Sequence, residues 1–397
     1  MSDQMRVVAL EEHLVVPEVL DAWARLDPAD HDLAYGPATE GETGWRLLDA
    51  GDERRAAMEA TGVDVHVLSL TTPGLQNLPS AEARALQPLV NDRITELVRG
   101  DPEHFHGLAT LATASPDAAA AELQRAVRTL GLDGAMLYGR AGGMGLDDPA
   151  LEPLWVAAEE MNVPLHLHPQ SPPPAVRAAY YDDFTAAVSA GLATHGIGWH
   201  YDAGVQFLRL VLSGVFDRHP RLRIVIGHWG ELVLFYLERV EHLAGPAGLA
   251  RTLTEYAREH VYVTPSGMLS ERYLRWATEV LGPDRLLFAT DYPFEAASGA
   301  GLARSSKGCR SRTRTARRSR PARGNGCGRE SGDERPLTVR LDAVRTASRS
   351  YRRERDHRRG AGAVHHFDAG DRDLRRHDPA AGVRRGGAGV DLLPAHP

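Results

Sequence analysis

Histidine and acidic residues follow several short apolar runs of this sequence, each at the point where a buried strand would end. Side chains of this kind offer oxygen and nitrogen donors, and such a mixture suits a divalent cation with open positions for a substrate. The sequence therefore predicts a metal site assembled from the ends of four strands. The candidates are Glu11 and His13 after the first run, His168 and His228 after two later runs, and Asp291 after the last.

The spacing within the first of these segments supports a shared site. Residues two apart on an extended chain project to the same side, so Glu11 and His13 can converge on one ion. A single histidine at a strand end is more often a hydrogen-bonded structural residue than a metal ligand. Coincidences at four strand ends in one chain reverse that balance and favour a metal site.

The cysteines and the charges divide the chain after Ser298. Both cysteines, Cys309 and Cys327, lie beyond that point, so the first 298 residues have no thiolate to bind a metal. From Gly299 onward the chain carries 24 of its 46 basic residues and 11 of its 53 acidic residues. This part has a formal charge of +13, and the part before it has −20. Histidines and carboxylates must therefore bind any metal in the first part.

Eight apolar runs of strand length position these candidates. Longer segments with helical spacing separate the runs, and this alternation is expected of a parallel sheet with helices packed outside it. Eight is the number of strands in a (β/α)8 barrel, whose active site lies at the carboxyl ends of the strands. We therefore predict an α/β protein with a TIM-type (β/α)8 barrel over residues 1–298. The predicted strands are residues 7–10, 65–70, 105–111, 134–137, 164–168, 224–227, 261–264 and 286–289.

The connecting segments include predicted helices and one long insertion. Apolar residues recur at three- and four-residue steps after Ser115, and helices are also predicted over residues 151–161 and 202–216. Residues 28–50, rich in Asp, Gly and Pro, are expected to form a loop rather than a further domain. Residues 169–201 carry three consecutive prolines and several aromatic residues, and they predict a lid over the barrel.

Residues 299–397 differ in composition from the rest of the chain. Arg, Gly, Ala and Ser dominate, and few apolar residues recur at any period, so no packed core is predicted there. A disordered tail and a basic arm for nucleic acid are two interpretations. We favour a third, out-of-frame translation of DNA rich in G and C, because Lys307 is the sole lysine of the chain.

Six short motifs are spread along the first 298 residues. They are Ala-Leu-Glu-Glu-His at 9–13, Leu-Ser-Leu-Thr-Thr-Pro-Gly at 68–74, Leu-His-Pro at 167–169, Ser-Gly-Val-Phe-Asp-Arg-His-Pro at 213–220, Gly-His-Trp-Gly-Glu at 227–231 and Ala-Thr-Asp-Tyr-Pro-Phe-Glu at 289–295. Together they resemble the decarboxylase branch of the amidohydrolase superfamily over roughly residues 5–297. This branch includes γ-resorcylate, 2,3-dihydroxybenzoate, 5-carboxyvanillate and aminocarboxymuconate semialdehyde decarboxylases.

The resemblance implies roles for particular residues. His228 would lie beside a metal as an acid/base or substrate-polarising group, and Glu231 would orient it, since a carboxylate fixes an imidazole's tautomer and raises its basicity. His166 stands where relatives often have an aromatic residue and is expected to be structural. Mn, Zn and Mg are the candidate ions, and an additional oxygen ligand favours Mn or Mg over Zn. The implied ligands of one divalent ion are Glu11, His13, His168 and Asp291.

The resemblance also implies a reaction, the non-oxidative decarboxylation of a small hydroxylated aromatic carboxylic acid by a carbon–carbon lyase. A metal bound to the carboxylate and an ortho hydroxyl would align the ring, and loss of CO2 needs a proton on the ring carbon. Asp291 or a water on the metal would carry this proton, and His228 would polarise or deprotonate the phenol. Arg239 and Phe294 are candidate substrate-binding residues, although an exposed helical arginine is the commoner outcome.

Other functions are compatible with parts of the same pattern. A hydrolase or hydratase of a small acid or lactone would keep the fold and the metal, with His228 activating water; uptake of water instead of CO2 release would distinguish it. A non-catalytic binding protein would not need an intact set of metal ligands. The acidic charge of the first part opposes binding to nucleic acid through the basic tail, and no nucleic-acid partner is expected.

Location and assembly are further expectations. No run approaches the roughly 18 consecutive apolar residues of a membrane span, and the N-terminus lacks the pattern of a secretion signal, so we expect a cytoplasmic protein. The resemblance implies a homodimer or homotetramer. Relatives continue after the last motif with a helix pair that covers the first and last strands, where this chain is rich in Arg. We therefore expect that residues 299–397 form no regular last βα unit, that barrel closure is weakened, and that the protein is less stable than its relatives.

Overall fold

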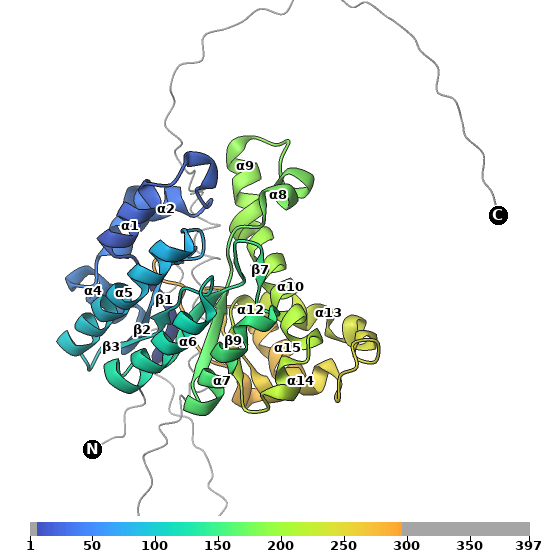
Figure 1. Ribbon diagram of the computed structural model, residues 1–397. Helices are drawn as coiled ribbons and strands as arrows, with labels where there is room; N and C mark the ends of the chain where they lie inside the picture. Colours follow the sequence, from blue (N-terminus) through green and yellow to red (C-terminus); the bar gives the residue numbers. More distant parts are fainter. Residues whose placement is uncertain (1–5, 296–397) are drawn as a thin grey trace, which may run out of the picture. The chain divides into compact units, whose positions relative to one another are not determined.

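A ring of parallel strands organises the computed structural model, which describes residues 6–295. Figure 1 shows helices packed around these strands. Two sheets, in the orders β1-β2-β3 and β10-β9-β8-β5-β4, make up most of the ring. They join where the Leu108 amide, between β3 and β4, donates to the Leu68 carbonyl at 2.8 Å. The strands are β1 (Val8–Leu14), β2 (Val65–Leu70), β3 (Phe105–Gly107), β4 (Ala109–Thr110), β5 (Ala135–Tyr138), β8 (Pro164–His168), β9 (Arg223–Ile226) and β10 (Val261–Val263).

Residues 286–289 close the ring as its eighth segment. Leu286 forms a parallel bridge with Val263, and Ala289 forms one with Leu10. The segment therefore contacts β10 on one side and β1 on the other, and the predicted (β/α)8 barrel is confirmed. These are isolated bridges, so the last segment is less regular than a strand. The predicted boundary after Ser298 and the predictions for residues 299–397 lie outside the described residues.

The first strand is longer than predicted. The apolar run predicts a strand over residues 7–10, whereas β1 continues to Leu14 and includes Glu11 and His13. Its pairing with β2 continues through these polar residues, all of which are buried. The two candidate ligands therefore lie within a buried strand and not in the loop after it.

Helices cover the outside of the ring, and no helix among residues 6–295 is both long and apolar enough to cross a membrane. A capping box, in which Thr252 and Glu255 bond each other's backbone amides, starts α14. The helices are α1 (Pro17–Ala24), α2 (Tyr35–Thr39), α3 (Gly41–Leu48), α4 (Asp52–Thr61), α5 (Ser80–Gly100), α6 (Pro116–Arg125), α7 (Glu152–Met161), α8 (Pro174–Tyr180), α9 (Ala186–Gly191), α10 (Gly198–Leu212), α11 (Val215–Arg218), α12 (His228–Glu231), α13 (Val233–Val240), α14 (Leu253–His260) and α15 (Glu271–Leu281).

Two expectations about the connecting segments are corrected. The helix predicted over residues 202–216 is two helices, α10 and α11, because Gly214 between them adopts a left-handed φ of 72°, which ends a helix. The prediction of a loop over residues 28–50 is wrong, since this segment contains α2 and α3. Ala38 and Leu47 on these helices are buried, and burial of such side chains stabilises helices that composition alone does not predict.

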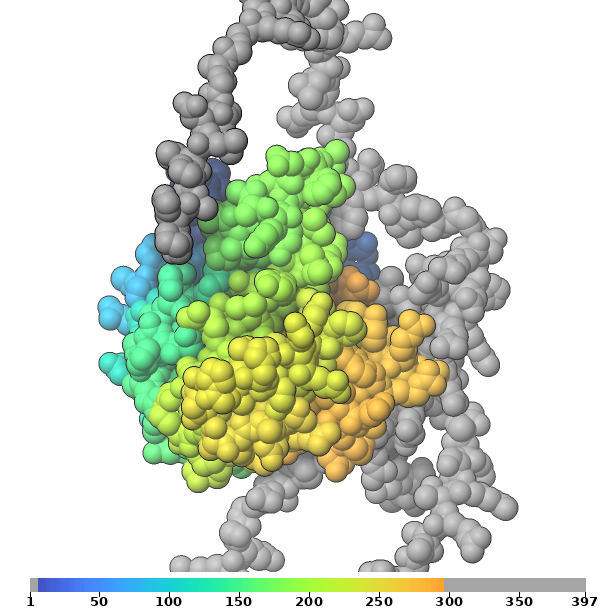
Figure 2. All heavy atoms as spheres, turned by 90° about the vertical axis from the view of Figure 1, so that its right-hand side faces the viewer, coloured from blue at the N-terminus to red at the C-terminus, as the bar shows by residue number. Residues whose placement is uncertain are grey.

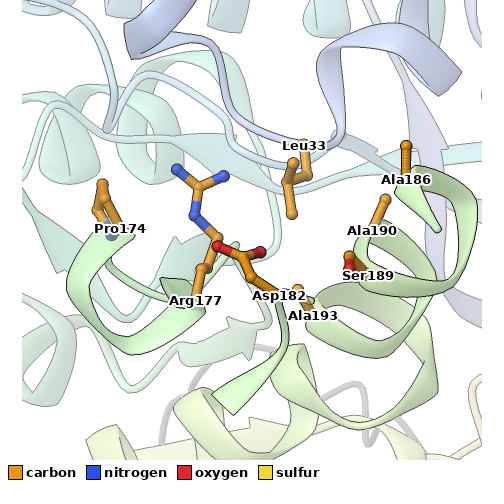
Figure 3. Close-up of a pocket in the computed structure, with 8 residues that line it drawn as sticks. All are labelled: Leu33, Pro174, Arg177, Asp182, Ala186, Ser189, Ala190 and Ala193. Carbon is orange, nitrogen blue, oxygen red and sulfur yellow. The ribbon is translucent and has the colours of Figure 1, made fainter. Parts of the chain in front are cut away.

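The insertion predicted as a lid, residues 169–201, contains α8, α9 and the first turn of α10. Figure 1 shows α8 and α9 projecting beyond the ring. A pocket of about 340 Å³ lies between this insertion and the loop before α2, and Figure 3 shows Arg177 and Asp182 among small side chains in its wall. No residue of the predicted metal site lines this pocket. Its lining residues are Leu33, Pro174, Arg177, Asp182, Ala186, Ser189, Ala190 and Ala193.

Two layers of apolar side chains stabilise the barrel. The larger layer lies between the strands and the helices and includes the fully buried Trp155 and Phe288. A smaller cluster fills the interior of the ring, with members from four strands, from the link between β3 and β4 and from the closing segment, as expected of a packed barrel core. Its members are Leu10, Val67, Leu108, Met136, Tyr138, Val225 and Leu287.

Truncation of Phe288 tests whether the closing segment is part of the cooperative core. Phe288→Ala is expected to lower the free energy of unfolding by about 3–5 kcal/mol, because it leaves a cavity between barrel and helices. Urea denaturation of the two proteins measures this change. Phe184→Ala in the lid, where the side chain is 61% exposed, is the matched control and should cost less than about 0.5 kcal/mol. Equal stability of both variants would contradict a packed closing segment.

Candidate active site

Four side chains from three parts of the barrel meet near the carboxyl ends of its strands. Glu11 and His13 lie on β1, His168 ends β8, and Asp291 follows the segment that closes the ring. One ligand atom of each side chain, a carboxylate oxygen or a ring nitrogen, lies within 4.8 Å of the other three. The structure therefore brings together the four side chains that the sequence predicts as metal ligands.

A β-bulge in β1 underlies the approach of Glu11 and His13. The register between β1 and β2 shifts between Ala9 and Glu12, and Glu11 has a left-handed φ of 67°. Left-handed backbone is uncommon for a residue with a side chain, and a bulge re-aims the side chains of its strand. Glu11 and His13 do converge as predicted. The chain is not regularly extended at Glu11, however, because the bulge lies between Ala9 and Glu12.

The ring nitrogens of His168 have defined roles. Its Nδ1 lies 2.8 Å from the Pro169 carbonyl, which can only accept, so Nδ1 donates and Nε2 of the neutral ring has no proton. Burial holds the pKa of His168 well below its usual range, which keeps the ring neutral. Its Nε2 lies 3.5 Å from Glu11 Oε1. A neutral imidazole fixed by a carbonyl is the form in which histidine binds a metal.

Two atoms of the cluster, Glu11 Oε1 and His13 Nε2, are buried without a hydrogen-bond partner among residues 6–295. His13 Nε2 lies 3.3 Å from Asp291 Oδ1. Burial raises the pKa of Glu11 to about 8, although the charge of His228 opposes this shift. A cation among the four side chains would provide a partner for both atoms and would favour the ionised carboxylate. The residues present therefore fit a divalent metal ion.

The second oxygen of Glu11 is held by residues that the motifs did not indicate. Thr264 Oγ1 donates to Glu11 Oε2 at 3.0 Å, and Ser266 Oγ donates to the same oxygen. Gly227 packs against this carboxylate, since a Cβ there would come within 2.9 Å of Glu11 Oε1. His166 is buried with its Nε2 3.5 Å from Glu11 Oε2. One oxygen of Glu11 is thus anchored, and the other faces the cluster.

His228 lies beside the cluster at the start of a strained turn. Every residue from 228 to 232 has a left-handed backbone, with φ between 46° and 90°. Consecutive residues in this region are costly and tend to occur where function requires them. His228 Nδ1 donates to Glu231 Oε1 at 2.7 Å, and His228 Nε2 lies 3.7 Å from Asp291 Oδ2. The turn therefore places one imidazole between two carboxylates.

The surrounding charges favour the protonated ring of His228. Burial alone would lower the pKa of His228, but the charge of Glu231 and the nearby Asp291 carboxylate outweigh burial and hold it well above its usual range. Burial also opposes ionisation of Glu231 and Asp291. The charge of His228 nevertheless holds the pKa of Glu231 below its usual range, and the neighbouring His13 ring does the same for Asp291. These opposite shifts favour a protonated His228 ring between two ionised carboxylates.

Comparison of the sequence with known protein families identifies the family of the chain. The family model for amidohydrolases matches residues 21–300, which is over half of the chain. The chain belongs to the amidohydrolase family. The resemblance inferred from the six motifs is therefore confirmed at the level of the family.

Relatives of this amidohydrolase are named as decarboxylases. The γ-resorcylate decarboxylase of Rhizobium radiobacter is 35% identical over 305 residues, which cover 72% of this chain and 88% of the relative. The 5-carboxyvanillate decarboxylase of Novosphingobium aromaticivorans, solved with manganese and 4-hydroxy-3-methoxy-5-nitrobenzoic acid, has a TM-score of 0.69 and 30% identity over 76% of this chain and 90% of its own. The dihydroxybenzoic acid decarboxylase of Polaromonas sp. JS666, solved with manganese and 2-nitroresorcinol, has a TM-score of 0.64 and 30% identity over 75% and 90%.

A histidine that the motifs did not indicate joins the site of the amidohydrolase. His200, on the first turn of α10, has its Nδ1 2.8 Å from Glu231 Oε2. Glu231 therefore contacts two imidazoles, one through each oxygen, since Oε1 accepts from His228. His200 lies within the lid insertion and is 31 residues from its partner, so neither strand periodicity nor motif spacing indicates it.

A second carboxylate on β1 of the amidohydrolase fastens the strand behind the cluster. Glu12 is buried and accepts hydrogen bonds from the amide of Thr290 at 2.8 Å and from the Thr290 hydroxyl. Arg54, also buried, donates from Nη2 to the His13 carbonyl at 2.6 Å. These contacts tie the backbone on both sides of the site, next to His13 and next to Asp291, and so limit how far the ligands can separate.

The two candidate substrate-binding residues differ in their surroundings. The Phe294 ring lies edge-on to His13, with 5.7 Å between ring centroids, so it borders the cluster. Arg239 is exposed on α13, and among residues 6–295 no hydrogen bond or ion pair joins its side chain to the cluster. Phe294 is therefore placed to contact a substrate in this chain, whereas Arg239 is not brought to the site by the chain's own fold.

Proposed function

We propose that this amidohydrolase is a metal-dependent, non-oxidative decarboxylase of a small hydroxylated aromatic carboxylic acid. The observation that carries the proposal is the cluster of Glu11, His13, His168 and Asp291 with His228 at 3.7 Å from Asp291. A metal site next to a protonated imidazole and a carboxylate suits the removal of CO2 from an electron-rich ring. Relatives that share the fold and about a third of their residues are named for this reaction on dihydroxybenzoates and on 5-carboxyvanillate.

One divalent ion is the proposed cofactor, and manganese is proposed first because two of the relatives were solved with it. Zinc and magnesium are the alternatives. When bound, the ion would polarise the carboxylate and the ortho hydroxyl of the substrate as a Lewis acid. The neutral His168 ring and the unpartnered Glu11 Oε1 support this assignment. The proposed ligands are Glu11, His13, His168 and Asp291.

The proposed reaction adds one proton and breaks one carbon–carbon bond. A proton adds to the ring carbon that bears the carboxylate, and the ring loses its aromaticity. The carbon–carbon bond then breaks, its electron pair returns to the ring, and CO2 leaves. Asp291 is proposed to deliver the proton, which it can take from the protonated His228, and His228 then polarises or deprotonates the phenol. Glu231 keeps the His228 ring oriented through its bond to Nδ1.

The surroundings of the cluster support an aromatic substrate. Phe294 borders the site and offers a ring face or edge to a planar molecule. Trp199, in the lid insertion, donates from Nε1 to Ser171 Oγ at 3.2 Å and fastens the insertion near the end of β8. We propose that the lid excludes water from the reacting ring, which favours protonation of carbon over competing hydrolysis.

Product analysis tests this proposal against its rival. The purified protein, loaded with manganese, is incubated with a panel of ortho-hydroxybenzoates, and CO2 and the phenol are measured together. Equal amounts of both products are expected from at least one acid. Conversion of a small acid or lactone with uptake of water, and without CO2, would instead favour the hydrolase or hydratase. The rival keeps the same metal ligands, so only the product separates the two.

Removal of one ligand tests the metal site directly. Protein dialysed against metal-free buffer and reloaded with manganese should hold about one ion per chain, as expected of a single set of four ligands. His168→Ala is expected to weaken binding at least about 10-fold, because it removes the neutral Nε2. Elemental analysis and titration with manganese measure both quantities.

The matched control for this measurement is another buried histidine. His260, at the end of α14, has Nδ1 2.8 Å from the Leu222 carbonyl and lies outside the cluster. His260→Ala should reduce stability without changing the manganese affinity. Equal affinity in His168→Ala and His260→Ala would show that His168 is no ligand.

A cytoplasmic location stays a prediction of the sequence. The proposed assembly is a homodimer or homotetramer. Figure 2 shows the face over α13, α14 and α15. Large apolar side chains are exposed on and near these helices. They support self-association, because contact with a second copy of the chain would bury them away from water. Measurement of the molecular mass in solution tests this. The residues are Leu232, Phe235, Tyr236, Met268 and Tyr273.

A further inference from the structure

The carboxylate that orients His228 is held from two sides. Glu231 Oε1 accepts from His228 Nδ1 at 2.7 Å, and Glu231 Oε2 lies 2.8 Å from Nδ1 of His200. The carboxylate is fully buried, whereas the two histidines come from different elements, α10 and the turn after β9. The position of Glu231 therefore depends on α10 as well as on its own turn.

The contacts of His200 define which of its atoms donate. Its Nε2 lies 3.0 Å from the carbonyl oxygen of His195, and its Nδ1 faces the Glu231 carboxylate. Both neighbouring oxygens are acceptors, so each ring nitrogen donates when both bonds form. The ring therefore bonds the lid backbone through one nitrogen and donates to Glu231 through the other.

The backbone of α10 also lies directly against Glu231. Gly204, one turn after His200, leaves room for this contact, because a Cβ at that position would come within 2.3 Å of the Glu231 carbonyl oxygen. A side chain there would push α10 away from the turn. Helix α10 thus contacts Glu231 at both its backbone and its side chain, which restricts how His200 can move relative to Glu231.

We infer that His200 is a positioning residue for the reaction. It couples the lid insertion to His228 through Glu231. This inference rests on the proposed decarboxylase function and deepens it, since it adds a residue that acts through another. With both oxygens bonded, Glu231 cannot rotate its carboxylate away from His228 Nδ1, so the His228 ring keeps its Nε2 directed to Asp291. A lid that shifts α10 would release Glu231 and misalign His228.

Two amide substitutions separate the two bonds of His200. Asn carries an amide nitrogen near the place of Nδ1 and can still donate to Glu231, whereas Gln carries one near the place of Nε2 and can donate only to the His195 carbonyl. We expect His200→Ala and His200→Gln to lower kcat about 10- to 100-fold with little change in KM, as for other residues that orient an active group. His200→Asn should retain most of the wild-type kcat. Manganese content should stay unchanged in all three, because His200 touches none of the proposed ligands.

A spectroscopic measurement makes the test independent of turnover. The His228 ring proton shared with Glu231 should give a downfield proton resonance in the full-length, manganese-free protein. It should persist in His200→Asn and shift or broaden in His200→Ala. His242→Ala, an exposed histidine outside the barrel, is the matched control and should change neither kcat nor the resonance.

The outcomes are distinguishable. Retention of kcat in His200→Gln but not in His200→Asn would overturn the inference, since His200 would then only hold the lid backbone. An unchanged resonance in His200→Ala would overturn it as well, whatever the activity. Absence of CO2 release by the wild-type protein would count against the proposed function alone, because the resonance still reports whether His200 positions His228.

Discussion

Asp291→Asn is expected to lower CO2 release on the order of 10³-fold while the chain keeps its fold. Asp291 lies close to both a proposed ligand and the proposed acid/base group, with Oδ1 3.3 Å from His13 Nε2 and Oδ2 3.7 Å from His228 Nε2. An amide can neither deliver a proton to the ring carbon nor supply the charge that helps to hold the pKa of His228 high. Its oxygen is also a weaker metal ligand.

The effect of Asp291→Asn on metal binding must be separated from its effect on proton transfer. CO2 release is therefore measured at increasing manganese concentration, together with urea denaturation of the apoprotein. The loss is expected to persist at saturating manganese. Recovery of activity under those conditions would mean that Asp291 acts only as a ligand. Asp284→Asn, an exposed aspartate a few residues earlier, is the matched control and should behave as the wild type.

The ligand positions could be predicted from the sequence because a parallel barrel brings the carboxyl ends of its strands to one face. The apolar runs before Glu11, His168 and Asp291 mark those ends with little ambiguity. Each polar residue then follows from its place after a run, without knowledge of the neighbouring strands. This is why residues separated by more than a hundred positions could be assigned to one cluster.

The backbone that aims these side chains could not be predicted in the same way. Glu11 has a left-handed φ at a bulge, and the turn from residue 228 to 232 is left-handed throughout. Such conformations are imposed by the surrounding fold on residue types that do not favour them. Sequence patterns report average preferences, so they predict an extended chain at Glu11 and give no sign of the strained turn.

Residues that hold the ligands from behind are also absent from the prediction. Thr264 and Ser266 donate to Glu11 across the ring, and His200 reaches Glu231 from the lid. Their types are common on any polar surface, and only the closed barrel and the folded lid bring them to their partners. The same reason explains the helices within residues 28–50, where burial overrides a composition that is typical of loops.

His228→Gln is expected to lower kcat on the order of 10²-fold, with the manganese content unchanged. Gln preserves a donor on the side chain but cannot take up or release a proton in the physiological range. His228 is 3.7 Å from Asp291 and is not one of the four proposed ligands, so its loss should affect chemistry and leave metal binding intact. Glu231→Gln should cost less, because an amide oxygen still accepts from His228 Nδ1. A larger loss in Glu231→Gln than in His228→Gln would contradict the role of Glu231 as an orienting group.

Combination of the two main substitutions tests whether Asp291 and His228 handle one proton. If His228 supplies the proton that Asp291 delivers, the Asp291→Asn, His228→Gln double variant should be little slower than Asp291→Asn alone, since residues that act as a unit lose their contributions together. Independent roles would instead multiply the two losses. The rate of CO2 release at saturating manganese distinguishes these cases. If the loss of rate in the double variant equals the product of the two single losses, His228 polarises the phenol independently of proton delivery by Asp291.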